Sequence, residues 1–600
     1  MKHPQHAESL EPRHFLAGVT VLFPAYDGGL TGWLDSAENA ITADLGGAQN
    51  VPRYVMTIAP YSSGLLAVQS VTHVAGTPTP QANNPGQILV TVDYTSVSTN
   101  PAYQASTTAD LVTNFMENTP VDGVTWADLP IHLISTSIGT AAEDATAQSF
   151  DSSGIWVDQE TYFDPHPDTD PPFNDPLNTV YDNVEFADDY WRTVPNADQS
   201  KNPTGTPIDG AYNLELTWVQ ADYSSFALAH LAPPSYYVGT IDPAMIGQYD
   251  GDGTIHADWY GNGSTPSTFP SPTQTGFLYT NIAGGTRPIS GLWSASGGTG
   301  VRTSVTHTGP QWPNVSDVVP TTTTVESGSA FNINYIREDQ GAAENIVFTL
   351  DSNQNPYDGS SYTLGTATNL ASSTTIRSGT FTGSLAGVAP GTYYVEAQAE
   401  DASGLTRYDY SIEKVTITPS IIPVTNPAHA SPRIVTATST RLIVAATDAK
   451  NGADLTYTWA FTHLPAGAHK PTIKGNGSKA VRATFFKPGL YRFTVTITDL
   501  KGHKSTSSNS VEVVPTAVKL SVTPTGATVA KRHKRKFTTT VLDQFGGAIA
   551  GPTPDYSIVS GPATIGRLNG IFRAGNTIGT ALIKVEDDGL SEIVDASVVN

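Results

Sequence analysis

The order of apolar and polar residues divides the chain into two halves. Up to about residue 315, short apolar runs alternate with segments whose apolar residues recur every three or four positions. Such runs are typical of buried strands, and such segments are typical of amphipathic helices. From about Pro320 onward the pattern changes to short period-two stretches separated by Gly, Asn and Asp. The sequence therefore predicts a mostly parallel sheet with helices on both faces, followed by three all-β immunoglobulin-like sandwiches.

The first half carries most of the predicted helix. We expect strands at 19–23, 54–58, 87–93, 130–136, 154–163 and 183–187, and helices at 33–45, 107–116 and 140–150. Strand and helix alternate along this order, which is the pattern of a doubly wound sheet.

An internal repeat divides the second half. Pro390-Gly391-Thr392-Tyr393-Tyr394-Val395 and Pro488-Gly489-Leu490-Tyr491-Arg492-Phe493 begin 98 residues apart, and both lead into a period-two strand that ends in Asp-x-x-Gly. This spacing is one sandwich long. We therefore expect a disordered N-terminus at 1–14, an α/β domain at 15–315, and sandwiches at 316–418, 419–515 and 516–600.

Composition narrows the possible functions. Among 600 residues, 55 are Asp or Glu and 31 are Lys or Arg, a formal net charge of −24, and there is no Cys. An acidic surface argues against nucleic acid as a main partner, and disulfides and thiol chemistry are excluded. No apolar run approaches the roughly 18 residues of a membrane span, so we expect none.

The first candidate for chemistry is the sequence Ser135-Thr136-Ser137-Ile138-Gly139, which follows a short apolar strand and precedes a run of small residues. This layout matches a nucleophile elbow, in which a tight strand-to-helix turn lifts one hydroxyl above a sheet. The usual pattern is Gly-x-Ser-x-Gly, and here Ser135 replaces the first glycine. An ordinary helix N-cap gives the same sequence, so the elbow needs partners elsewhere.

Two later residues supply such partners in the right order. Asp164 directly follows the strand expected at 154–163, and open α/β sheets gather their reactive groups beyond the carboxyl ends of strands. His230 precedes a Pro-Pro break. Ser137, Asp164 and His230 thus occur in the order nucleophile, acid, base, which is the chain order of α/β-hydrolases.

The flanking residues resemble the pancreatic-lipase-like branch of the α/β-hydrolases, over about residues 15–310. In that branch the acid lies in a Leu-Asp-Pro motif, and a Tyr pair follows the histidine six and seven residues on. Phe163-Asp164-Pro165 and His230 with Tyr236-Tyr237 match both features. The resemblance implies acyl transfer through a Ser137–Asp164–His230 triad on a small-molecule or lipid ester. We expect no cofactor and no metal ion.

The resemblance also implies an oxyanion hole. The backbone N–H of Ile138, the residue after the nucleophile, would be one donor, and that of Ala25 or Tyr26 would be the other. The chain departs from the branch here, because Pro24-Ala25 stands where His-Gly is usual and Thr136 where His is common. A catalytically degenerate homologue, acting as a cell-surface adhesive or scaffold protein, is therefore the alternative.

Three nearby motifs have other interpretations. His166 is an alternative base, although it lies very close to Asp164 in the chain. Asp250-Gly251-Asp252-Gly253-Thr254-Ile255 resembles a calcium loop but lacks the terminal Glu, so we expect a Gly-rich turn. The Pro- and Asp-rich run at 168–178 has no periodicity, and we expect it to be a loop at the site entrance.

The sandwich modules carry resemblances of their own. The module at 419–515 resembles polycystic-kidney-type (PKD) or cadherin-like modules, and that at 516–600 resembles a bacterial Ig-like group 2 domain. Together with the Leu10-Glu11-Pro12-Arg13 start, they resemble planctomycete-type surface proteins of bacteria. This implies an extracellular or cell-surface protein whose modules act as spacers or adhesive units.

One basic cluster, Lys531-Arg532-His533-Lys534-Arg535-Lys536, occurs in this acidic chain. A charged strand edge that discourages edge-to-edge pairing is one interpretation. Docking to an anionic cell-surface or matrix polymer is the other.

Overall fold

The computed structural model describes residues 18–25, most of 32–260, Phe277 and most of 302–600. Eight strands form one sheet at the start of the chain. The gaps within these ranges include 79–85, 101–104 and 194–203. The sheet order is β3-β2-β4-β1-β5-β6-β7-β8. Every neighbouring pair is parallel except the β2–β3 hairpin. The strands are β1 (Gly18–Phe23), β2 (Arg53–Pro60), β3 (Leu66–Ala75), β4 (Gln87–Asp93), β5 (Ile131–Thr136), β6 (Val157–Phe163), β7 (Val184–Trp191) and β8 (Tyr212–Glu215).

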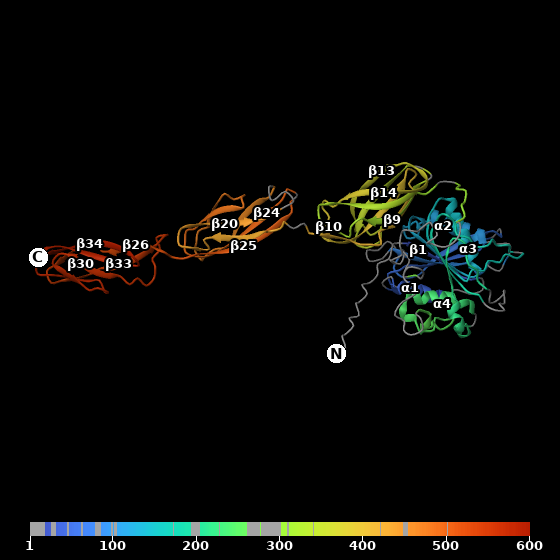
Figure 1. The fold of residues 1–600 in the computed structure, drawn as a ribbon, viewed down its shortest axis with the longest axis horizontal. Coiled ribbons are helices and arrows are strands. Elements are labelled where there is room, and N and C mark those ends of the chain that lie inside the picture. The colour runs from blue at the N-terminus through green and yellow to red at the C-terminus, as the bar shows by residue number, and fades with distance from the viewer. Residues whose placement is uncertain are drawn as a thin grey trace. The chain divides into compact units, whose positions relative to one another are not determined.

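Helices cover both faces of this sheet. Helices α1 (Trp33–Asp44) and α4 (Ala232–Ile241) share one apolar cluster with Leu22, and α2 (Ala105–Asn118) shares the cluster on the other face with Val21. Helix α3 (Gly139–Ser152) contacts α2 (Figure 1). Short 3₁₀ turns lie at Trp126–Asp128, Thr217–Ser225, Ala229–Leu231, Pro243–Met245 and Ala257–Tyr260. No helix among the described residues is both long and apolar enough to cross a membrane.

The strand order creates a switch point. From β1 the chain moves to one side of the sheet to build β2 and β4, and it then crosses to β5 on the other side of β1. The carboxyl ends of β1 and β5 therefore border the crevice where open α/β sheets bind ligands. The predicted parallel sheet with helices on both faces is confirmed, and the Ser137 turn lies at this crevice.

The first sandwich belongs to the same compact unit, which spans Met1–Pro419. One of its sheets contains β10 (Thr324–Glu326), β17 (Val415–Thr418), β15 (Gly391–Asp401), β12 (Glu344–Asp351) and β13 (Tyr362–Leu370), with β16 (Thr406–Tyr410) beside β15. The other contains β14 (Ser373–Ser384), β11 (Ala330–Asp339) and β9 (Asn314–Pro320).

Arg407 of β16 joins this sandwich to the amino-terminal ends of the first sheet. Its guanidinium is buried and donates to the carbonyls of Ala127, Leu129 and Trp156 at 2.7–2.9 Å, and it lies 3.5 Å from the Asp158 carboxylate. These groups lie at the end of the sheet opposite the Ser137 turn, because they precede or begin β5 and β6. The first sandwich is thus fixed to the sheet by a buried charge.

The second unit, Ser420–Asn600, contains two further sandwiches and no helix among its described residues. Sheets β18-β20-β23-β22 and β19-β25-β24-β21 form the first of them, and β26-β29, β27-β34-β33-β30 and β28-β32-β31 form the second. Their strands are β18 (Asn426–Ser431), β19 (Ile434–Val435), β20 (Ser439–Ala445), β21 (Thr456–His463), β22 (Thr472–Lys474), β23 (Ala480–Thr484), β24 (Gly489–Thr498), β25 (Lys504–Val513), β26 (Ala517–Thr523), β27 (Gly526–Ala530), β28 (Lys534–Lys536), β29 (Thr538–Asp543), β30 (Asp555–Ser560), β31 (Ala563–Ile565), β32 (Ile571–Ala574), β33 (Gly579–Asp587) and β34 (Leu590–Val599).

The predicted repeat corresponds to equivalent strands, β15 and β24. The hydroxyl of Tyr393 donates to the carbonyl four residues before it at 3.1 Å, and that of Tyr491 does the same at 2.8 Å. Both strands lead into an Asp-x-x-Gly turn whose glycine, Gly404 or Gly502, has φ of 89°. The identical spacing of the two copies therefore reflects a tyrosine hydrogen bond and a glycine turn that occur in both.

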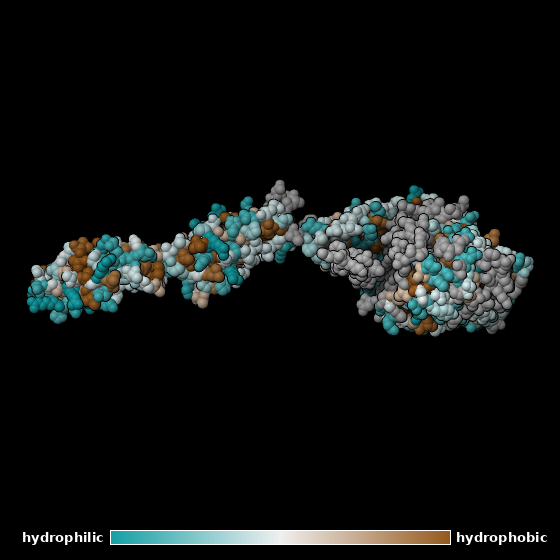
Figure 2. Space-filling model, turned by 60° about the horizontal axis from the view of Figure 1, so that its bottom comes forward, coloured by the Kyte–Doolittle hydropathy of each residue, from teal (hydrophilic) through white to brown (hydrophobic). Residues whose placement is uncertain are grey.

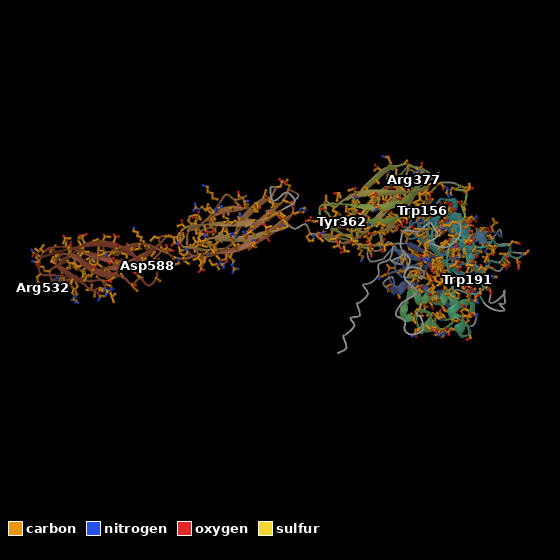
Figure 3. All side chains as sticks on the ribbon, in the orientation of Figure 1. Trp156, Trp191, Tyr362, Arg377, Arg532 and Asp588 are labelled. Carbon is orange, nitrogen blue, oxygen red and sulfur yellow. The ribbon has the colours of Figure 1, made fainter. Side chains whose placement is uncertain are left out.

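We predict that Arg407→Met destabilises the first unit. The variant leaves Asp158 without its cation and three carbonyls without a donor, which should lower the free energy of unfolding by about 3–5 kcal/mol. Calorimetry of the full chain measures this, since the second unit provides an internal reference. Arg377→Met, on the exposed surface of the same sandwich (Figure 3), is the matched control and should leave the transition unchanged. Equal transitions for both variants would contradict the role of Arg407.

Candidate active site

Ser137 lies directly after β5 in a strained turn. Its φ is 56°, a left-handed conformation that costs a non-glycine residue roughly 1–2 kcal/mol. Its N–H donates to the Phe163 carbonyl at 2.9 Å, and its carbonyl accepts the N–H of His166 at 3.2 Å. The turn is thereby held between the two residues that flank the end of β6, and the side chain is 8% exposed. This is the strand–turn–helix geometry expected of an elbow.

Gly139, two residues after Ser137, occupies a position that only a residue without a side chain can fill. A Cβ added at Gly139 would lie 2.8 Å from the Pro24 carbonyl oxygen and 2.9 Å from that of Phe23. Both are backbone atoms and cannot move aside easily. The start of α3 therefore lies against the end of β1, and Gly139 permits this approach.

Ser135 has its own partner, which accounts for the missing first glycine. The Ser135 side chain is buried and donates a hydrogen bond to the Glu143 carboxylate on α3. It therefore links the end of β5 to the second turn of α3, and a glycine would leave Glu143 with the Thr161 N–H, at 3.2 Å, but without the Ser135 hydroxyl.

Asp164 and His230 meet beside this turn. Asp164 follows β6 with φ of 49°, is fully buried, and has its Oδ2 3.0 Å from Nδ1 of His230. Thr136 pairs with Phe163 in the sheet, so the acid and Ser137 lie at neighbouring strand ends. The structure brings together the acid and base predicted from the sequence and places the predicted nucleophile on the adjacent strand.

Arg192 is a participant that the sequence analysis missed. Its guanidinium is fully buried, with Nη2 2.8 Å from Asp164 Oδ2, and its backbone N–H donates to Asp164 Oδ1 at 3.2 Å. One carboxylate oxygen thus serves both the arginine and His230. Arg192 comes directly after β7, so its position at the next carboxyl end was a possible signal.

The predicted Tyr pair supports the histidine from α4. Tyr236 and Tyr237 are buried, and the Tyr237 ring lies 5.0 Å from Phe163 and 5.3 Å from Tyr190 between ring centroids. Since α4 begins two residues after His230, these contacts fix the helix against the ends of β6 and β7. The His230 turn is positioned through that helix.

The predicted oxyanion donors lie only partly within the described residues. Ile138 is the N-cap residue of α3, Ala25 lies two residues after β1, and each is half-buried. Neither backbone N–H has an acceptor among the described residues. The carbonyl of Pro24, the residue before Ala25, accepts a hydrogen bond from the Tyr94 hydroxyl at 2.5 Å. Tyr26 lies outside the described residues.

The three neighbouring motifs have separate structural roles. His166 is half-buried, and burial together with the charge of His230 lowers the pKa of His166. The Asp250 loop is a turn whose Asp252 carboxylate accepts the N–H of Trp33 at the start of α1, at 2.6 Å. The run at 168–178 is irregular and ends at Asn178, which bonds to Thr140 just after the elbow.

A group of buried carboxylates lies beneath the elbow, on the α3 face of the sheet. Glu143, Asp144 and Glu160 are each buried. Burial, and then repulsion by Glu160, raises the pKa of Glu143 well above its usual range, and burial raises the pKa of Asp144 to about 7. Burial and the charge of Asp144 also raise the pKa of Glu160 strongly. These side chains are therefore protonated at a pH where carboxylates normally are not.

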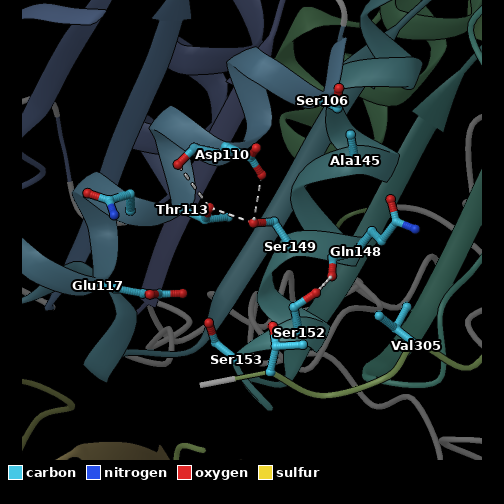
Figure 4. A pocket seen from close by; sticks show the side chains of 12 residues that line it. Ser106, Asp110, Thr113, Glu117, Ala145, Gln148, Ser149, Ser152, Ser153 and Val305 are labelled. Atoms are coloured by element: carbon cyan, nitrogen blue, oxygen red, sulfur yellow. Dashed lines mark hydrogen bonds between the residues drawn. The ribbon is translucent and has the colours of Figure 1, made fainter. Parts of the chain in front are cut away.

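Two further polar sites are separate from this geometry. Asp222, His256 and Asp258 have potential metal-ligand atoms within 4.8 Å of one another, but Asp222 already accepts the Trp259 indole N–H at 3.0 Å. A polar groove of about 420 Å³ lies between α2 and α3 (Figure 4) and is lined by Ser, Thr, Asp110 and Glu117 among others. None of the three predicted triad residues lines this groove.

No protein-family model and no curated protein matches the chain. Similar solved structures include cadherin domains 3–6 of protocadherin γB7 (13% identity, 47% of this chain and 73% of that chain, TM-score 0.22). Domains 4 and 5 of the S-layer protein SbsC are also similar (18% identity, 34% of this chain and 89% of that chain, TM-score 0.15). So is the PKD domain from the KIAA 1837 protein (25% identity, 17% of this chain and 97% of that chain, TM-score 0.13). At these TM-scores the likeness gives no information on the function or location of this chain. These structures do not bear on the first sheet, so its hydrolase likeness rests on the residues above.

We predict that Arg192→Met destabilises the first unit strongly. Without the guanidinium the buried Asp164 loses its cation, at a cost of about 3–5 kcal/mol. Arg53→Met is the matched control, because it breaks a more exposed pair with Glu38 at 3.5 Å and should cost at most about 1 kcal/mol. Denaturant unfolding of both variants measures the difference. A similar loss in both would show that Asp164 does not depend on Arg192.

We predict that the first unit loses stability as the pH rises from about 4.5 to about 8. Carboxyl groups whose folded pKa is raised stabilise the fold at low pH and lose this contribution as the pH passes toward the folded pKa. Glu160→Gln mimics the protonated acid, so its melting temperature should fall less over this range than that of the wild type. Glu326→Gln, on an exposed position of the first sandwich, should keep the wild-type slope. An unchanged slope in Glu160→Gln would contradict this account.

Proposed function

We propose that the first sheet carries a serine hydrolase of lipase or esterase type that acts by acyl transfer. The observation that carries the proposal is the Asp164–His230 pair, held at 3.0 Å beside a left-handed turn at Ser137. Each feature alone has a structural explanation. Their convergence at the switch point of a doubly wound sheet, in the chain order of α/β-hydrolases, supports catalysis.

The proposed proton path runs through Ser137, His230 and Asp164. Ser137 Oγ attacks the ester carbonyl carbon, and Nε2 of His230 accepts the hydroxyl proton. The tetrahedral intermediate collapses as the C–O bond to the alcohol breaks and His230 returns the proton to the leaving oxygen. Water then attacks the acyl carbonyl with His230 again as base, the C–Oγ bond to Ser137 breaks, and His230 returns the proton to Oγ as the carboxylic acid leaves. Asp164, at Nδ1, fixes the tautomer in which Nε2 is the proton acceptor.

The developing oxyanion would be held by the backbone N–H groups of Ile138 and Ala25. Both adjoin the close approach of α3 to the end of β1, where Gly139 brings the two backbones together. Each donor of this kind is worth about 3–4 kcal/mol of transition-state stabilisation. A small-molecule or lipid ester is the substrate class, and bacterial export to the cell surface would suit the sandwich modules.

One observation favours the alternative, a degenerate hydrolase that serves as an adhesive or scaffold. Arg192 forms a buried ion pair with Asp164 at 2.8 Å. Asp164 therefore has a structural role that would preserve it without catalysis. The two functions differ in whether Ser137 is an activated nucleophile.

We predict that a fluorophosphonate probe labels the wild-type chain and fails to label Ser137→Ala. The probe reacts with activated serines, so His230→Asn should also reduce labelling, and ester turnover should fall by about 10⁴-fold or more in each variant. Intact-mass analysis counts the adducts per chain, peptide mapping locates the adduct at Ser137, and circular dichroism confirms that both variants fold.

Ser152→Ala is the matched control, because Ser152 lies at the end of α3 and its hydroxyl donates to the Gln148 carbonyl of the same helix. It should label like the wild type. A folded wild-type chain that resists labelling would support the scaffold function instead.

A further inference from the structure

The last sandwich concentrates positive charge at one end. Lys531, Arg532 and the strand β28 (Lys534–Lys536) lie consecutively, and all but Lys531 are exposed. Strand β28 pairs with β32, and this pairing places Arg573 directly opposite Lys534. Arg573, also exposed, is 39 positions further along the chain, so folding extends the cluster beyond the consecutive run. We call these six cations the basic tip.

The backbone of the basic tip is fixed by the fold. Arg532 has φ of 65°, its N–H donates to the Ala574 carbonyl at 3.2 Å, and the N–H of Lys531 donates to Val599 at 2.9 Å. The Arg532 guanidinium bonds to the Asn576 side chain at 2.8 Å. The backbone that carries these charges is thus ordered before any ligand binds, so binding does not have to supply the conformational entropy lost in ordering it.

No carboxylate balances these charges within the described residues. None of the six cations forms an ion pair there, whereas Lys584 and Arg567 of the same sandwich each pair with an acid. Lys534 and Arg573 oppose each other directly across the strands, an arrangement that destabilises a sheet. The fold therefore bears a cost for gathering these cations, and a ligand that neutralises them would remove it.

Asp555, Glu586, Asp587, Asp588 and Glu592 lie toward the other end of this sandwich, whereas Asp595 lies nearer the tip, four residues before Val599. Arg532 and Asp588 are at opposite ends of the sandwich (Figure 3), and hydrophilic side chains gather at the basic tip (Figure 2). The β33–β34 ladder runs eight residue steps from Gly579 to Asp587, or about 27 Å. This exceeds the Debye length of about 8 Å at physiological salt. The acids at the far end therefore do not screen the tip.

We propose that the basic tip is a binding surface for a linear anionic polysaccharide. A flexible chain of carboxylate or sulfate groups can follow the row of cations and gains affinity by releasing its counterions. The tip consists of charged side chains along a strand and a turn, and a stable protein–protein interface would need an apolar centre. Base readout in duplex DNA generally requires a helix or ribbon placed in a groove, and single-stranded nucleic acid is bound on aromatic stacking platforms. The tip residues include no helix and no aromatic side chain, and the β28–β32 pair belongs to a three-stranded sheet and is not a separate ribbon.

The test uses the full chain and dextran sulfate as probe, with the triple variant Lys534→Gln, Arg535→Gln, Lys536→Gln. The wild type should bind at low salt, and the slope of log K against log salt should be about −4 for six contacts of a flexible polyanion. The triple variant should roughly halve that slope. Isothermal titration at several NaCl concentrations measures both.

A triple variant of the preceding sandwich, Lys470→Gln, Lys474→Gln, Lys479→Gln, removes the same charge from three exposed positions and should bind like the wild type. Equal losses in both triples, or no binding by the wild type at low salt, would overturn the proposal. So would tighter binding of duplex DNA than of dextran sulfate. Salt-sensitive self-association that the tip triple abolishes, without polysaccharide binding, would assign the surface to a second copy of the chain instead.

Discussion

The arrangement of the first unit depends on two left-handed turns at neighbouring strand ends. Ser137 and Asp164 leave β5 and β6 with φ of 56° and 49°, and each would cost roughly 1–2 kcal/mol in isolation. Backbone bonds from Ser137 to Phe163 and from His166 to Ser137 lock the two turns together. Because neither turn can relax without breaking the other's bonds, the predicted nucleophile and acid keep a fixed relation. The strain is thus concentrated where the candidate chemistry lies.

Strand β6 connects this site to the rest of the unit through its acids. Asp158 at its start meets Arg407, Glu160 in its middle is attracted by Arg302, and Asp164 beyond its end meets Arg192. All three arginines come later in the chain, and Arg407 belongs to the first sandwich. Burying Asp158 or Asp164 without its cation would cost several kcal/mol. We infer that the sheet and this sandwich fold as one body, so the sandwich is more than a spacer for the first domain.

Local signals were sufficient to predict most of the first sheet and the acid–base pair. Periodicity identified β1, β4 and β5 because their residues are buried in strict runs, and strand ends identified Asp164. The edge strand β3 was missed because its outer residues are mostly exposed and break the alternation. Helix α4 was missed because it is apolar on all sides and begins with Pro-Pro. Arg192 and Arg407 could not be predicted, since long-range ion pairs leave no fixed spacing in a sequence.

The departures from the lipase-like pattern are compensated within the turn itself. Ser135 replaces the first glycine and donates a hydrogen bond to Glu143. Pro24-Ala25 replaces His-Gly, and the Pro24 carbonyl accepts a hydrogen bond from the Tyr94 hydroxyl at 2.5 Å. Gly139 still allows α3 to approach the end of β1. A degenerate site under no constraint would be free to lose this packing, because neither Tyr94 nor Gly139 is needed for the Asp164–Arg192 ion pair. The close packing of α3 against the end of β1 therefore favours the hydrolase proposal over the scaffold alternative, even though Ser135 and Pro24-Ala25 depart from the pattern that the chain resembles.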